Sequence, residues 1–111
     1  MIEERSFQFA LRTITLVKAL RKANEYVFAD QILRSATSIG SNVAEAGAGQ
    51  SKKDFIAKMA IASKEARETR YWLRLLKESD LIVFHLSDLL DEVNKIIKIL
   101  TKIVKTSQLK T

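Results

Sequence analysis

The side chains that carry catalytic chemistry in other proteins are few and isolated in this sequence. It has one histidine, His85, and no cysteine, which excludes disulfides and thiolate metal sites. Glu65 and Glu68 are three residues apart, but no Glu-x-x-His pair of the kind found in di-iron helix bundles accompanies them. Ser51 has no base nearby in sequence, and its segment lacks the glycine spacing of a phosphate-binding loop. These residues predict no catalytic site, no metal site, no cofactor and no small-molecule substrate.

Positive charge is the chemical feature that remains. The chain has 19 Lys and Arg against 13 Asp and Glu, a formal net charge of +6. Such an excess favours a polyanionic partner such as nucleic acid, and a basic surface without any partner is the alternative. The candidate nucleic-acid contacts are Lys52, Lys53, Lys64, Arg67, Arg74, Lys95, Lys98, Lys102 and Lys105.

These basic residues have two competing interpretations. Lys52 and Lys53 lie at a predicted helix start, where free amides and the helix dipole already favour phosphate. Tyr71 lies at helical spacing among the basic residues, in a strip that suits phosphate binding or stacking on a base. A solvated strip with i, i+4 ion pairs, such as Lys64 with Glu68, would explain the same pattern.

The rest of the chain predicts the helices that position these side chains. There is no proline, there are only three glycines, and 47% of the residues are hydrophobic, so we expect one all-α domain over residues 1–111. Apolar spacing predicts helices over residues 4–24, 28–45, 52–77 and 83–105, and a polar tail that frays over residues 106–111. Four amphipathic helices with short connections predict an antiparallel up-down-up-down four-helix bundle.

Two predicted helices carry apolar residues on more than one side. In the first, Phe7, Leu11, Ile14 and Val17 form the stripe expected to face the core. The third and fourth helices have long core stripes, namely Phe55, Met59, Ala62, Ala66, Thr69, Leu73 and Leu76, and then Leu86, Leu89, Leu90, Val93, Ile96, Ile97, Leu100, Ile103 and Val104. Apolar residues off these stripes predict a subunit interface of Phe9, Leu16, Ile61, Trp72 and Leu75. Isolated exposed apolar side chains are the alternative, since these are normal on any surface.

The segment over residues 36–55 joins the second and third helices. Ala36, Gly40 and Ala44 recur at every fourth residue, which predicts the close approach of another helix. Gly47 and Gly49 predict a helix end in the left-handed conformation, and Ser51 predicts an N-cap for the helix that follows. A neighbouring polar line is either a solvated face or a hydrogen-bonded seam between helices, and it consists of Arg34, Ser38, Ser41 or Asn42, and Glu45.

This segment also resembles a bacterial family of four-helix bundle proteins that are encoded in intervening sequences of 23S rRNA genes. The matching residues are Ser38, Ile39, Ser41, Asn42, Val43, Ala44 and Glu45, followed by Gly49, Ser51, Lys52, Lys53, Asp54 and Phe55. The sequence departs from the family pattern at Gly40, where proline is usual, at Ala46, where glycine is usual, and at Gln50, where arginine is common. Residues 71–76 also resemble the accessory variability protein (Avd) of diversity-generating retroelements.

The resemblance implies a homopentamer of four-helix bundles with a basic surface that contacts nucleic acid and with no enzymatic activity. In the retroelement relative, the pentamer partners a reverse transcriptase. We therefore expect an oligomeric, non-catalytic accessory protein that binds RNA or DNA. The alternative is an interaction module with a protein partner, such as a reverse transcriptase or a ribosome-associated factor. No apolar run approaches the roughly 18 residues of a membrane span, so we expect a cytoplasmic protein.

Overall fold

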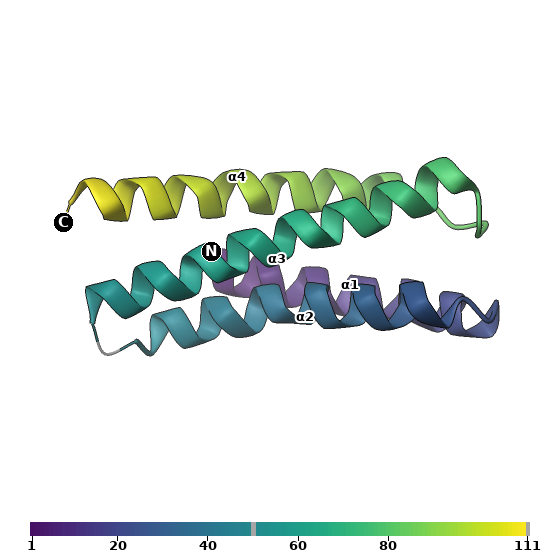
Figure 1. The fold of residues 1–111 in the computed structure, drawn as a ribbon, viewed down its shortest axis with the longest axis horizontal. Coiled ribbons are helices and arrows are strands. Elements are labelled where there is room, and N and C mark those ends of the chain that lie inside the picture. The colour runs from purple at the N-terminus through teal and green to yellow at the C-terminus, as the bar shows by residue number, and fades with distance from the viewer. Residues whose placement is uncertain (50, 111) are drawn as a thin grey trace.

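Four long helices make up most of the chain (Figure 1). The computed structural model describes residues 1–49 and 51–110. The helices are α1 (Ile2–Lys22), α2 (Tyr26–Gly47), α3 (Lys52–Ser79) and α4 (Ser87–Leu109), with no strand among the described residues. Each connection reverses the chain direction, and α1 packs on α2, α2 on α3 and α3 on α4. The predicted all-α, up-down-up-down four-helix bundle is confirmed.

The core runs along the whole rod, which measures 47 × 20 × 20 Å. In α3 the predicted stripe from Met59 to Leu76 is buried, and only Phe55 at its start is partly exposed. Of the stripe predicted for the fourth helix, the residues from Leu86, just before α4, to Leu100 are buried, and only Leu90, Ile103 and Val104 are partly buried. The fully buried large side chains are Phe9, Leu16, Leu20, Ile32, Ile39, Leu73, Leu76, Ile96 and Leu100.

The inward face of α1 differs from the predicted one, of which Val17 is buried and Ile14 is partly buried. Phe9 and Leu16 are fully buried, whereas Phe7 is 58% exposed and Leu11 is 47% exposed. The predicted subunit contacts of Phe9 and Leu16 are therefore wrong, because neither side chain reaches the surface. The inward side was missed because it also carries two polar residues, Ser6 and Thr13, which are buried. Their hydroxyls donate to backbone carbonyls three residues earlier, at 3.1 and 2.7 Å, so burial leaves them satisfied.

The connection between α2 and α3 agrees with the prediction only in part. Ser51 is the N-cap of α3, and its hydroxyl accepts a hydrogen bond from the Asp54 amide at 3.0 Å. The expected left-handed glycine is wrong, since no glycine in the described residues has a positive φ. Left-handed residues instead end the other two connected helices, with Asn24 after α1 at φ 62° and Asp80 after α3 at φ 55°. Asn and Asp tolerate this conformation better than most side chains do.

The last helix begins later and ends later than predicted. Residues 81–86 are not helical, and their burial alternates, with Ile82, Phe84 and Leu86 turned toward the core and the residues between them exposed. This alternation is typical of an extended segment, and its apolar content made it look like part of a helix. At the other end α4 continues to Leu109, so the predicted helix end at Lys105 is wrong, whereas fraying of the tail stays a prediction; Thr111 lies outside the described residues.

The close approach predicted at Gly40 is present and leaves a little space. A Cβ atom at position 40 would lie 3.6 Å from two oxygen atoms of Ser6 in α1, which is an ordinary van der Waals distance. We therefore expect Gly40→Ala to stabilise the protein by about 0.5–1 kcal/mol, because alanine loses less backbone entropy in a helix. Urea denaturation measures the effect, and a loss of stability would mean that the two helices require glycine at this contact.

Candidate nucleic-acid interface

The structure brings the basic residues of α3 and α4 onto one surface. Two hydrogen bonds set the antiparallel register, from the Arg67 guanidinium to the Thr101 hydroxyl at 3.0 Å and from Arg70 to the Asn94 side-chain oxygen at 3.2 Å. Lys98 lies between Asn94 and Thr101 along α4, and its side chain is exposed. All nine predicted contact residues are exposed: Lys52, Lys53, Lys64, Arg67, Arg74, Lys95, Lys98, Lys102 and Lys105. We call this surface of α3 and α4 the basic face.

The positive charge of the basic face is largely uncompensated. Arg67 bonds to a hydroxyl and Arg70 to an amide oxygen, both of which are neutral. Within residues 1–49 and 51–110, Arg74 is the only one of the nine predicted residues with an ion-pair partner, Glu78 at 3.1 Å. The remaining charges are therefore available to an anionic ligand.

The lysines at the start of α3 join the same end of the bundle as the last turn of α4. Lys52 donates from Nζ to the Lys110 carbonyl at 3.0 Å. In Figure 1 the start of α3 and the end of α4 extend past the beginning of α1. The basic face therefore continues to this tip, where the free amides of the first turn of α3 add a positive field.

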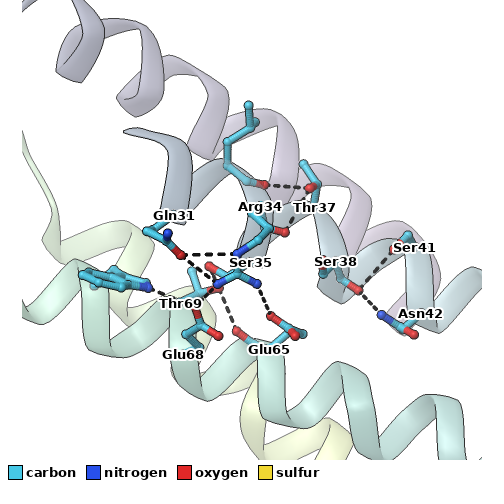
Figure 2. Close-up of polar contacts among 12 residues, drawn as sticks. Gln31, Arg34, Ser35, Thr37, Ser38, Ser41, Asn42, Glu65, Glu68 and Thr69 are labelled. Atoms are coloured by element: carbon cyan, nitrogen blue, oxygen red, sulfur yellow. Dashed lines mark hydrogen bonds and ion pairs between the residues drawn. The ribbon is translucent and has the colours of Figure 1, made fainter. Parts of the chain in front are cut away.

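A polar cluster between α2 and α3 compensates the charge of Arg34. Arg34 contacts the carboxylates of Glu65, at 3.2 Å, and Glu68, and also the side-chain oxygen of Gln31 (Figure 2). The predicted Lys64–Glu68 pair is thus replaced by an Arg34–Glu68 pair between helices. At Arg34 the polar line predicted in α2 is a hydrogen-bonded seam between helices, because this side chain contacts Glu65 and Glu68 of α3.

The same seam has a buried centre and a second ion pair farther along. The hydroxyls of Ser35 and Thr69 hydrogen-bond to each other at 2.8 Å in the buried interior. Glu45 pairs with Lys58 at 3.2 Å. These contacts hold α2 and α3 in register. None of them involves the basic residues of α3 that belong to the basic face.

The described residues contain no cluster of three His, Cys, Asp or Glu side chains that could hold a metal ion. His85 lies in the exposed connection before α4, with its Nε2 3.6 Å from an oxygen of Asp88. The part of the chain that the structure describes contains no helix long and apolar enough to cross a membrane.

Comparison with known proteins supports the resemblance seen in residues 36–55. The model of the 23S rRNA-intervening sequence protein family matches residues 1–102. The chain belongs to this family. The predicted membership is confirmed, whereas the relation to Avd stays a prediction. No curated protein matches the chain.

A solved structure agrees with both the family and the fold. It is the crystal structure of a protein of unknown function from the S23 ribosomal protein family of Bacteroides thetaiotaomicron VPI-5482. The two chains are 42% identical, the match covers 95% of this chain and 99% of the other, and the TM-score is 0.89.

This member of the 23S rRNA-intervening sequence family also has an apolar groove on the outer side of α1 and α2. The groove has a volume of about 410 Å³, and its apolar lining consists of Phe7, Ala10, Leu11, Ile14, Gly40 and Ala44. Sequence reasoning missed it because Phe7 and Leu11 were assigned to the core. The signal in the sequence was that α1 carries apolar residues on two sides, only one of which can face the core of a single bundle.

The other predicted interface residues lie on α3. Ile61 is 41% exposed and Leu75 is 37% exposed. Trp72 is half-buried, and its ring packs edge-on against Phe28 of α2 at a centroid distance of 5.7 Å. Its indole nitrogen donates to Glu68 at 3.1 Å, so Trp72 mainly joins α3 to α2 within one subunit.

Proposed function

We propose that this protein is an oligomeric, non-catalytic accessory protein that binds nucleic acid through the basic face. The observation that carries the proposal is the placement of exposed lysines and arginines from two helices on one surface, with neutral partners for Arg67 and Arg70.

The arrangement suits recognition of the phosphate backbone. Lys95 and Lys105 are ten residues apart on α4 and so span about 15 Å along the helix axis. Lysine and arginine that contact phosphates release condensed counterions, which makes binding strong at low salt and tolerant of sequence. All nine basic residues are exposed, so we expect contacts with the phosphate backbone to dominate.

A titration of fluorescein-labelled structured RNA and duplex DNA with the protein, at about 50 mM salt, tests this function. Binding at micromolar protein is expected for both ligands. Absence of binding to both would overturn the proposal and leave the protein-partner alternative.

We also propose that the apolar groove of α1 and α2 forms a subunit interface in a homo-oligomer, with a pentamer as the assembly. Phe7 and Leu11 expose large apolar side chains at this groove, and exposed apolar surface often marks a protein interaction site. Ile61 on α3 is a further candidate contact on a separate surface. A head-to-tail interface between two different surfaces closes into a ring when the rotation permits it.

The groove proposal predicts that Phe7→Glu dissociates the oligomer. The new carboxylate would have to enter an apolar contact, which costs several kcal/mol unless it is paired. Light scattering should change from five times 12.6 kDa, about 63 kDa, to 12.6 kDa. Val83→Glu is the matched control, since Val83 is fully exposed in the connection before α4. An unchanged mass for Phe7→Glu would exclude the groove from the interface.

A second candidate function is an interaction module for another protein. The same groove favours it, because an amphipathic helix buries its apolar face in a groove between two helices. A monomeric wild-type protein that does not bind nucleic acid would favour this function over the first.

A further inference from the structure

An exposed aromatic ring lies on α3 between Arg67 and Arg74 of the basic face. Tyr71 is 59% exposed, and it follows Lys64 and Arg67 at helical spacing on the outward side of α3. Its ring packs edge-on against Trp72, with a centroid distance of 5.5 Å and an interplanar angle of 75°. Trp72 is held in turn by Phe28 and Glu68. Tyr71 is therefore supported from beneath.

A shallow pocket adjoins this ring. It has a volume of about 150 Å³ and is lined by Tyr71, Arg74, Leu75 and Glu78. Arg74 donates to one carboxylate oxygen of Glu78 from Nε at 3.2 Å and from Nη2 at 3.1 Å. The pocket thus combines an aromatic ring, an aliphatic side chain and an oriented carboxylate acceptor.

We propose that this pocket binds one unpaired nucleobase. The proposal rests on the proposed function, and it specifies single-stranded or looped nucleic acid as the ligand. The base would stack on Tyr71, because every base has a π-face and stacking tolerates sequence. Its exocyclic amino group would donate to Glu78, as cytosine, adenine and guanine can. Arg67, one turn away on α3, would contact the adjacent phosphate.

The pocket and the rest of the basic face would then divide the recognition. Lysines such as Lys98 and Lys105 would contact the phosphates of any strand, whereas a base reaches the pocket only when it is not stacked in a duplex. The predicted consequence is a preference for unpaired strands that depends on Tyr71 and not on the lysines.

The test compares Tyr71→Leu with Tyr71→Phe at about 50 mM salt. Three probes of about 12 nucleotides serve as ligands: a single strand, the same strand without bases, and the corresponding duplex. Tyr71→Leu should weaken binding of the single strand about tenfold and leave the other two affinities unchanged. Tyr71→Phe keeps the stacking ring and should bind all three as the wild type does.

Fluorescence of Trp72 gives a second readout, because it is the only tryptophan in the chain. Its emission should change when the single strand binds and remain constant with the strand that lacks bases. The pocket would be overturned if Tyr71→Leu bound the single strand as tightly as the wild type does, or if its affinity for the duplex fell by the same factor. Binding of nucleic acid by the basic face would stand in either case. If the wild type bound none of the three probes, the proposed function and the pocket would both be overturned.

Discussion

Replacing Leu100 with aspartate should leave the protein unfolded. Leu100 lies on α4, it is fully buried, and it belongs to the core that all four helices share. Loss of the leucine side chain alone costs about 2–5 kcal/mol. An unpaired carboxylate in the apolar interior adds several kcal/mol more, and single domains are stable by only about 5–15 kcal/mol. Far-UV circular dichroism should show loss of helix at room temperature.

Leu109→Asp is the matched control for this prediction. Leu109 is on the same helix, but its side chain is 87% exposed. The substitution should change the free energy of unfolding by no more than about 0.5 kcal/mol. A Leu100→Asp variant that is as helical and as resistant to urea as Leu109→Asp would contradict the assigned core face of α4.

Reversing two charges on the basic face should weaken nucleic-acid binding strongly. Lys98 and Lys105 are both exposed on α4 and flank Thr101, where Arg67 of α3 makes its contact. Each Lys→Glu change removes a phosphate contact and adds repulsion, so we expect on the order of a tenfold loss of affinity for each at low salt. The double variant Lys98→Glu, Lys105→Glu should fold normally, since neither side chain is in the core. Fluorescence anisotropy with a labelled RNA measures the affinity.

The control reverses the same amount of charge elsewhere. Lys18 and Lys22 are exposed on α1, which packs more on α2 than on α4. The variant Lys18→Glu, Lys22→Glu should retain most of the affinity. Equal losses in the two double variants would mean that net charge, and not the basic face, governs binding.

The fold could be predicted from the sequence because helical spacing is a local property. In α3 the apolar residues step by four and three from Phe55 to Leu76, and the structure buries this stripe. In α1 the same reasoning failed, since Phe7–Leu11 and Phe9–Leu16 are both apolar series at helical spacing. The choice between them depends on the neighbouring helices and on Ser6 and Thr13, whose hydroxyls bond within α1 itself.

The candidate site was predictable as residue types and not as an arrangement. The nine basic residues follow from the sequence, and all of them are exposed. Whether the basic residues of α3 lie beside those of α4 depends on how the two helices are aligned. The Arg67–Thr101 and Arg70–Asn94 contacts fix this alignment between residues far apart in the sequence, and helical spacing does not reveal it. The apolar groove was missed for a related reason, because it combines the misassigned side of α1 with small residues of α2 such as Gly40.

The salt dependence of RNA binding tests the basic face most directly. The logarithm of the association constant should fall linearly with the logarithm of the salt concentration, with a slope of about −0.7 to −0.9 for each phosphate contacted. Measured between about 50 and 200 mM salt, the Lys98→Glu, Lys105→Glu variant should show a slope shallower by about two contacts than that of the wild type. Wild-type binding that does not vary with salt, or identical slopes for the two proteins, would contradict a nucleic-acid interface on α3 and α4.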